Sequence, residues 1–333
     1  MNFLCSPSAS LRRHVIAATA LMLCWNSFVA QAQNAFPSKP VTLVVGFPPG
    51  SAPDIVARAY GQSLADQLKQ PVVVDNRAGA GGQIAARFVA SSPPDGYTLL
   101  VGDIGSMAIA PAAFSKLPYK PSKDLRALAE LSNNLFVLVT SAQTGPKNFA
   151  DFLKAAKASK DPVNLATFGP GTIVHFGLDM LAASGGFKST AIHYRSTGDV
   201  LVAVLSGDVQ AAYVSPALAL QQVAAGKMRA LAVTSEARSP LMPDVPTYPE
   251  LGLPSPNLYG WLSAFVPSAT PAPLVTLLKQ KIDAAAINPA LRQQLEPLGF
   301  DLGRIKSVDI EKYVQDETDR WEVVVKRSSF RGD

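Results

Sequence analysis

Apolar runs and helical repeats alternate along the chain from residue 41 onward. The first run, 41–47, reads VTLVVGF, and the segment 55–68 that follows repeats its apolar residues at a helical spacing. The same pattern predicts a strand over 71–74, a helix over 83–90 and a strand over 98–101. Strands separated by helical stretches are typical of a parallel sheet with right-handed crossovers.

The alternation starts again near residue 135, which predicts a second α/β unit. Its expected strands are 135–140, 163–167, 191–194, 211–214 and 230–234, and its expected helices are 149–157, 174–183, 200–205 and 217–225. Residues 239–256 are rich in proline and predict an irregular connector. A strand over 259–266 and helices over 274–286, 290–295 and 310–326 complete the predicted elements.

Residues 1–32 have the composition of a secretory signal peptide. Arg12 and Arg13 precede the apolar run 15–23, and Ala30-Gln31-Ala32 supplies the small residues of a cleavage site. A membrane anchor is the alternative, but the apolar run is interrupted and short of the roughly 20 residues that span a bilayer. A lipoprotein would use Cys24, and the large Leu23 before it argues against that cleavage.

The amino-acid composition limits which kinds of protein the mature chain can be and which ligands it can bind. The chain has 333 residues, which suits two domains, and its 48% apolar and 17% charged residues are ordinary for a globular protein. Cys5 and Cys24 are the two cysteines, so we expect no disulfide, thiolate ligand or cysteine nucleophile after cleavage. The formal net charge falls from +5 to +3 without the two leader arginines. This mild charge and the lack of a basic run argue against nucleic acid and are compatible with an anionic ligand.

Two glycine-containing turns each connect a predicted strand to a predicted helix. The first, 47–54, reads FPPGSAPD, and the second, 167–175, reads TFGPGTIVH. Helix N-termini leave backbone N–H groups unpaired and bind carboxylate or phosphate. If both strands end at one cleft, the backbones of Gly50, Ser51 and Ala52 in the first turn can share a ligand with the second turn.

Side chains in these turns add candidate contacts. Ser51 and Asp54 fit a capping box, and Thr172 is expected to cap the second helix while its hydroxyl faces a ligand. His175 lies one turn into that helix, and either hydrogen-bonds a ligand or packs as a structural residue. His193, at a strand end, is interpreted as structural.

Other polar and glycine-rich stretches are interpreted as structural features. The cluster 76–83, NRAGAGGQ, matches no phosphate-loop spacing and predicts tight packing. Asp103 is expected to cap a turn, and Ser106 to line the rim of the cleft. Trp261 is assigned to the core, and the terminal Arg331-Gly332-Asp333 to a chance triplet in an exposed tail.

Several ordered blocks resemble the Bug-type solute-binding proteins of tripartite tricarboxylate transporters. They include FPSKPVTLVVGFPPGSAPDIVAR from residue 36, QPVVVDNRAGAGGQIAA from residue 70, PPDGYTLLVGDIG from residue 93 and AGKMRALAVTSEARSPLMPDVPTYPELGL from residue 225. The resemblance implies an α/β fold of two lobes, a type II-like Venus flytrap, with the ligand in the cleft between its domains. It implies a signal peptide over 1–32, one domain from 33–134 with 256–333, a second from 135–255, and crossings near 135–140 and 259–264.

The resemblance also implies that both turns hold a ligand carboxylate, largely through backbone amides and water, and that Phe168, Arg195 and Tyr213 shape the pocket. The full candidate set is Phe47, Gly50, Ser51, Ala52, Asp54, Ser106, Thr167, Phe168, Gly169, Gly171, Thr172, His175, Arg195 and Tyr213.

This chain departs from the family pattern at four positions. Ser51 and Pro53 replace a glycine and a threonine of the common turn, and Pro53 cannot donate an N–H. Pro170 stands where members often have asparagine, and Val214 where they often have an acid. Without that acid, a carboxylate with an apolar or hydroxyl-bearing body is favoured over an amino acid.

The sequence therefore predicts a periplasmic, monomeric solute receptor that is not an enzyme. It is expected to bind a small organic carboxylate, to use no cofactor or metal, and to deliver its ligand to membrane transporter subunits. Two alternatives stay open: a ligand sensor that signals to a sensor kinase, and an exported enzyme with His175 as general base.

Overall fold

The computed structural model describes residues 36–333 except 195, 329, 331 and 333. The expected signal peptide and Arg195 therefore lie outside the described residues. Residues 39–333 form one compact unit, to which the following description applies. None of the helices in this described part combines the length and apolar character needed to cross a bilayer.

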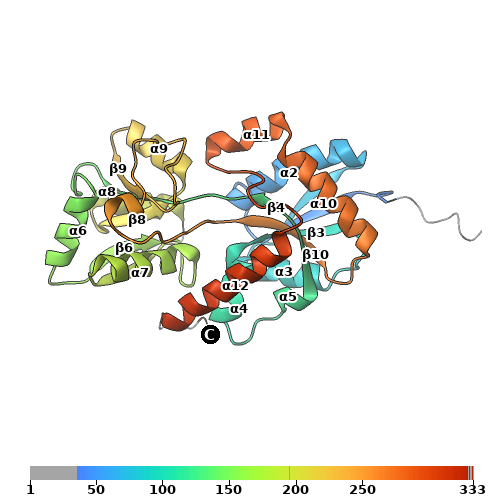
Figure 1. The fold of residues 1–333 in the computed structure, drawn as a ribbon, viewed down its shortest axis with the longest axis horizontal. Helices are drawn as coiled ribbons and strands as arrows, with labels where there is room; N and C mark the ends of the chain where they lie inside the picture. The colour runs from blue at the N-terminus through green and yellow to red at the C-terminus, as the bar shows by residue number, and fades with distance from the viewer. Residues whose placement is uncertain (1–35, 195, 329, 331, 333) are drawn as a thin grey trace, which may run out of the picture. The chain divides into compact units, whose positions relative to one another are not determined.

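The first sheet has five strands in the order β2-β1-β3-β10-β4 (Figure 1). Its strands are β1 (Val41–Val45), β2 (Val72–Asn76), β3 (Thr98–Asp103), β4 (Leu125–Ser132) and β10 (Leu262–Pro267). β1 pairs in parallel with β2 and β3, whereas β10 is antiparallel to both of its neighbours. β4 was not predicted from the sequence.

The second sheet repeats this plan with the order β7-β6-β8-β5-β9. Its strands are β5 (Val137–Ser141), β6 (Val163–Thr167), β7 (Ser189–His193), β8 (Ala211–Val214) and β9 (Met228–Val233). β6 is parallel to β7 and β8, and β5 is antiparallel to β8 and β9. The parallel pairing expected from the alternation is confirmed for β1 with β2 and β3 and for β6 with β7 and β8. β5 and β10 run antiparallel to their neighbours, because each enters from the other sheet rather than after a helical crossover.

Helices cover the sheets at most of the predicted places. They are α2 (Ala52–Leu68), α3 (Gln83–Ala90), α4 (Ala110–Ala113), α5 (Pro121–Asp124), α6 (Phe149–Ala158), α7 (Ile173–Gly185), α8 (Thr197–Ser206), α9 (Pro216–Ala224), α10 (Ala272–Ala286), α11 (Pro289–Leu295) and α12 (Ile310–Arg327). Single helical turns occur at η1 (Ala80–Gly82), η2 (Gly105–Ile109), η3 (Pro249–Leu251) and η4 (Glu296–Leu298). The connector 239–256 contains only η3 as regular structure, which confirms the irregular segment expected from its prolines.

Two chain segments connect the sheets and pair with each other. Asn134 N donates to Gly260 O at 3.2 Å, and Gly260 N donates to Asn134 O at 2.8 Å. Leu135 and Tyr259 form the antiparallel bridge between these segments. The crossing points thus lie where the family resemblance placed them, while the domain boundaries stay a prediction.

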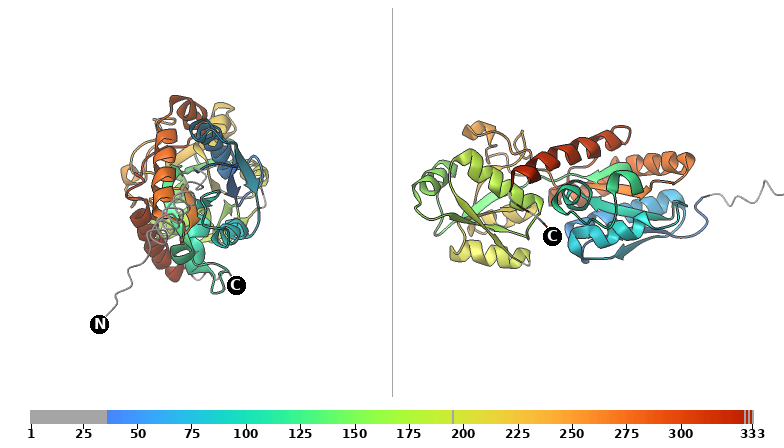
Figure 2. Two further views of the ribbon diagram at one scale, coloured as in Figure 1. Left: turned by 90° about the vertical axis from the view of Figure 1, so that its right-hand side faces the viewer. Right: turned by 90° about the horizontal axis from the view of Figure 1, so that it is seen from below.

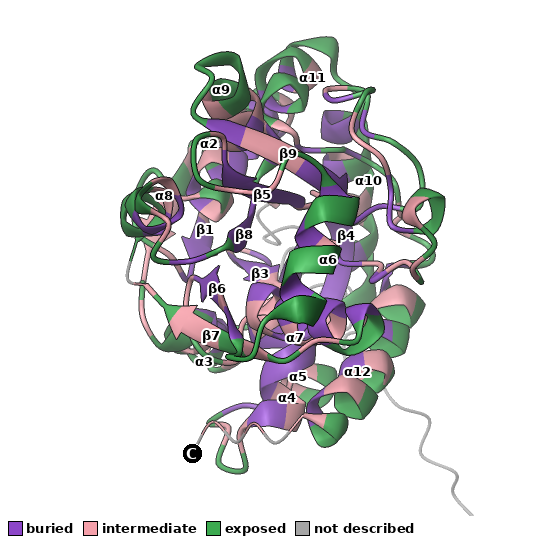
Figure 3. Cartoon of the chain, turned by 90° about the vertical axis from the view of Figure 1, so that its left-hand side faces the viewer, coloured by how far each residue is buried: buried purple, intermediate pink, exposed green. Residues whose placement is uncertain are grey.

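The core consists of the strands and the inner faces of their helices, as the burial colours of Figure 3 show. Trp261 and Trp321 are fully buried, which confirms the assignment of Trp261 to the core. Glu317 lies between them, and its Oε2 accepts both indole N–H groups at 3.3 Å. This carboxylate links α12 to Trp261, just before β10. α12 also packs on η2, α4 and β4, and Figure 2 shows this helix in red from two further sides.

Replacement of Glu317 by leucine should lower the free energy of unfolding by about 2–4 kcal/mol. The variant leaves two buried indole N–H groups without an acceptor, and each such group costs about 1–3 kcal/mol. Glu322→Leu on the same helix is the control, because Glu322 is exposed and forms an ion pair with the likewise exposed Lys326; its effect should stay within about 0.5 kcal/mol. Equal losses in urea unfolding of the two variants would contradict this account.

Candidate functional site

The first turn is stabilised by its own acidic residue. Asp54 is buried and accepts hydrogen bonds from Gly50 N, Arg58 Nε and Asn76 Nδ2, each at 2.9 Å. Burial alone would raise the pKa of Asp54, but these hydrogen bonds and the charge of Arg58 outweigh it and lower the pKa. The Gly50 N–H, a predicted ligand donor, therefore already has an acceptor within the turn.

The capping box expected at this turn does not form. Ser51 occupies the N-cap of α2 but its side chain makes no capping bond, and Asp54 bonds to Gly50 rather than to Ser51. Pro53 contributes to this result, because it removes one N–H that a cap would satisfy. The buried Ser51 Oγ has no hydrogen-bond partner among the described residues, so a polar atom of this turn stays unmatched.

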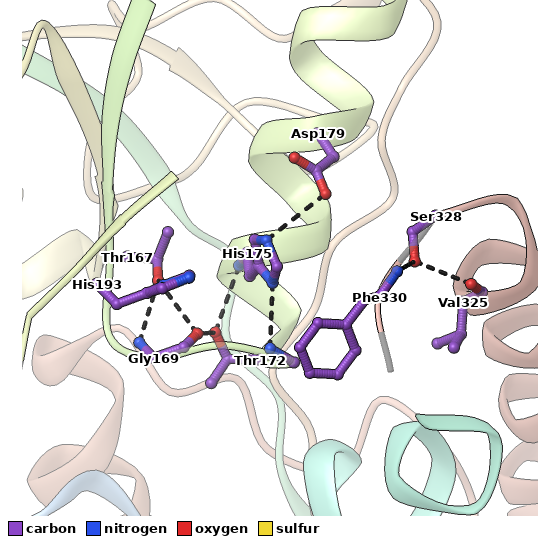
Figure 4. A network of polar contacts seen from close by, with 10 residues as sticks. Thr167, Gly169, Thr172, His175, Asp179, His193, Val325, Ser328 and Phe330 are labelled. Atoms are coloured by element: carbon purple, nitrogen blue, oxygen red, sulfur yellow. Dashed lines mark hydrogen bonds and ion pairs between the residues drawn. The ribbon is translucent and has the colours of Figure 1, made fainter. Parts of the chain in front are cut away.

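The second turn is held together by two threonines, as Figure 4 shows. Thr167 Oγ1 accepts from Gly169 N at 3.0 Å. Thr172 Oγ1 donates to Gly169 O at 2.9 Å and accepts from His175 N at 3.3 Å. The predicted cap by Thr172 is thereby confirmed, and its hydroxyl hydrogen is used within the turn.

His175 joins this network through both ring nitrogens. Its Nδ1 accepts from Gly171 N at 3.1 Å, and its Nε2 faces Asp179 Oδ2 at 3.7 Å (Figure 4). Burial raises the pKa of Asp179, although His175 and His193 oppose this shift. Both nitrogens of His175 thus face partners on the chain itself.

His193 belongs to the same cluster, which the sequence interpretation did not reveal. Its Nδ1 lies 2.8 Å from Thr167 Oγ1, and its ring meets that of His175 edge to face at 5.0 Å between centroids. Burial, followed by the charge of His175, lowers the pKa of His193, while Asp179 acts in the opposite direction. Only the parallel pairing of β6 and β7 brings this strand end beside the turn.

The C-terminal segment also reaches the second turn. The Phe330 ring lies 5.6 Å from His175 and 5.7 Å from Phe176, and a Cβ on Gly171 would come within 2.8 Å of it. Gly332 N donates to Ala113 O at 2.9 Å. The expectation of an exposed tail is wrong for Gly332, which is partly buried because it packs on the Phe114 ring; Arg331 and Asp333 lie outside the described residues.

A cavity of about 780 Å³ adjoins this cluster. His175 and Asp179 line one side, Phe330 and Arg327 line another, and the 254–256 stretch of the connector completes it. The first turn contributes no residue to its lining. In this structure the cavity therefore lies between α7, the connector and the C-terminal segment.

The remaining predicted residues of the first sheet form tight internal structure. Asp103 accepts from Gly105 N at 2.9 Å and from Ser106 Oγ at 2.5 Å, which confirms the capped turn and engages the Ser106 hydroxyl. A Cβ on Gly46 would lie 2.5 Å from Gly82 Cα. This close approach confirms that the third glycine cluster serves packing.

The predicted pocket residues of the second sheet are largely covered. Tyr213 is fully buried and shares a 2.5 Å hydrogen bond with the Tyr248 hydroxyl. Val214 is buried in an apolar cluster, and Phe168 packs against the same cluster from a partly exposed position. Within the described residues, no group of three or more His, Cys, Asp or Glu side chains is arranged to hold a metal ion.

Comparison with known proteins relates the chain to transporter receptors. A family model described as "Tripartite tricarboxylate transporter family receptor" matches residues 56–330. The chain is 31% identical to Protein BugT of Bordetella pertussis over 299 residues, which cover 90% of this chain and 92% of BugT.

Two solved structures extend this similarity to the fold. MatC from Rhodopseudomonas palustris with bound malate is 34% identical, covers 87% of this chain and 100% of its own, and has a TM-score of 0.76. R. palustris Rpa4515 with adipate is 28% identical, with coverage of 87% and 97% and a TM-score of 0.79.

The depressed pKa of His193 predicts a pH dependence of stability. The unfolded chain takes up this proton near pH 6.5, but the folded protein takes it up only at lower pH. The free energy of unfolding should therefore decrease as the pH falls from about 6.5 through the folded-state pKa. His193→Gln should flatten this decrease in urea unfolding across that range. A proton NMR titration that places His193 at or above about 6.5 would contradict the prediction.

Proposed function

The chain belongs to the tripartite tricarboxylate transporter receptor family, and from this premise we propose that it is an exported, periplasmic receptor for a small organic carboxylate. In this proposal the leader over 1–32 is cleaved, and the loaded protein delivers its ligand to membrane subunits of a transporter. The observation that carries the proposal is the near full-length similarity to MatC with malate and Rpa4515 with adipate. Receptor function requires no covalent step, and we propose none.

We place the ligand at the two glycine turns. The N–H groups of Gly50, Gly169 and Gly171 are engaged by side chains in this structure, so a ligand needs other donors or has to displace those side chains. Further backbone donors are the N–H groups of Ala52 and Asp54 in α2 and of Ile173 and Val174 in α7, because the first N–H groups of a helix lack helical acceptors. The unpartnered hydroxyl of Ser51 adds a polar contact.

The proposed site keeps the candidate residues that the sequence predicted, and we assign them different roles. Phe47, Ala52, Thr167, Phe168 and Thr172 belong to the turns themselves, and Asp54 and His175 stabilise them from within. Ser106 and Tyr213 are retained from the sequence, although their hydroxyls already bond to Asp103 and Tyr248. Arg195 is retained from the resemblance alone.

Two donor sets on different sheets favour a ligand with a carboxylate at each end. Closure of the lobes, 33–134 with 256–333 against 135–255, would bring both sets onto one dicarboxylate by rotation at the Asn134–Gly260 crossing. Each hydrogen bond to a charged group contributes about 1.5–3 kcal/mol. A few of them, less the cost of closure, give micromolar affinity, or about −8 kcal/mol.

Thermal-shift measurements with malate, adipate and citrate, followed by calorimetry, should identify binding of at least one dicarboxylate, since a ligand of the native state raises apparent stability. Transport is tested separately, by uptake of that acid in cells with and without the gene. Binding without any dependence of uptake on the gene would reject delivery while retaining the receptor. No binding of any short di- or tricarboxylate would reject both.

Gly50→Ala should weaken dicarboxylate binding at least tenfold, whereas Gly252→Ala should change it by less than about twofold. The two glycines are matched: their φ angles are +79° and +77°, and a Cβ on either meets nothing within 4 Å. Each alanine should thus cost a similar 1–2 kcal/mol of stability from positive φ. Only at Gly50 would the new methyl group occupy space that the proposed ligand needs. Equal affinities of the two variants in calorimetry would exclude the first turn from the ligand site.

A further inference from the structure

A second cavity of about 780 Å³ lies beside the paired crossing segments. Asn133 and Tyr259 of these segments line it, together with the 235–241 loop after β9, the start of α9, and the stretch from α11 to Arg304. None of the turn residues proposed for the dicarboxylate lines it. β4 and β9 are edge strands, and two strands separate each of them from β1 and β6, where the turns begin. The cavity is therefore distinct from the proposed carboxylate site.

Both sheets contribute walls to this cavity. Pro216 at the start of α9 follows β8 of the second sheet. Gly299 lies just before Asp301, which forms an antiparallel bridge with Asn133 at the end of β4 in the first sheet. A Cβ on Gly299 would lie 3.1 Å from Pro216, so the two walls are in direct contact at one rim. The enclosed volume falls in the range of about 300–1,000 Å³ that small-molecule sites occupy.

The lining includes three arginines, two of which form ion pairs with a glutamate. Arg292 pairs with Glu296 at 2.6 Å, and Arg238 pairs with Glu250 at 3.0 Å. Arg304 has no carboxylate within ion-pairing distance among the described residues. Its guanidinium instead lies over the Tyr259 ring, 4.5 Å from the centroid, and remains accessible to solvent. An arginine held in this way presents a planar set of N–H donors for a carboxylate.

The rest of the wall is apolar and partly aromatic. Leu135, Leu241 and Phe300 line the cavity together with Tyr259 and Arg304. A flat apolar body fits such a wall better than a chain of polar groups, because aromatic faces contribute dispersion and stacking over a large area.

We propose that this cavity is a second binding site of the protein, for a small aromatic monocarboxylate whose carboxylate pairs with Arg304. The ring lies against Tyr259 and Phe300. None of the residues proposed to contact the dicarboxylate lines this site, although Asn134 of the proposed hinge does.

Calorimetric titration with 4-hydroxybenzoate tests the proposal on the purified protein. The wild type should bind it at millimolar or lower concentration, and Arg304→Met, which keeps the apolar stem of the side chain, should bind at least tenfold more weakly. Arg238→Leu is the matched control, because it removes an arginine of the same cavity whose charge is already neutralised; binding should change less than about threefold. Gly50→Ala should likewise leave this binding unchanged.

A measurement on the wild type alone covers the case in which Arg304→Met does not fold. In methyl-labelled protein, 4-hydroxybenzoate should shift the signals of Leu135 and Leu241 and leave that of Leu64, which is buried in α2, in place. No binding at millimolar concentration, equal loss in the Arg304 and Arg238 variants, or loss in Gly50→Ala would each overturn the second site. The last result would assign the aromatic acid to the turns instead.

Discussion

The reciprocal pairing of Asn134 with Gly260 is the constraint on which the rest of this structure depends. The chain leaves the first sheet after β4 and re-enters it as β10, which lies between β3 and β4 rather than at an edge. The first sheet is thus incomplete until the last third of the chain has crossed back. Gly260 has little room for a side chain at this point, since its Cβ would lie 3.0 Å from Asn134 Oδ1. Trp261 follows immediately and anchors α12 through Glu317. One backbone contact therefore aligns both sheets and the C-terminal helix.

The two glycine turns show how far an anion-binding sequence signature determines a site. Both turns form where the apolar pattern placed them, and both open a helix. Their glycine N–H groups, however, are satisfied by Asp54, Thr167 and His175. Backbone donors seldom stay unpaired in a folded protein, so a chain without a ligand provides its own acceptors. Binding at such a turn is an exchange of one acceptor for another, and its free energy is the difference between two sets of hydrogen bonds.

Much of the fold was predictable because its elements carry strong local signals. The Val163–Thr167 and Ala211–Val214 strands and the Gln83–Ala90 helix match the prediction residue for residue. β4 was missed because LRALAELS combines good helix formers with two charges, and its strand conformation comes from pairing with β10. The antiparallel direction of β5 and β10 is not contained in any local pattern. His193 and Phe330 reach the second turn only through tertiary structure, so neither could be assigned to it from spacing.

The two proposed sites differ in what they can recognise. Amide donors at helix N-termini are fixed in direction and carry only partial charge, so they select the distance between two carboxylates more than the body that joins them. A guanidinium over a tyrosine ring offers full charge next to an apolar surface, so it selects one carboxylate and the flat group attached to it. These requirements conflict within a single pocket, because a wall that stacks on a ring leaves no donors for a second carboxylate. Separate locations, at the turns after β1 and β6 and beside the edge strands β4 and β9, allow one chain to satisfy both.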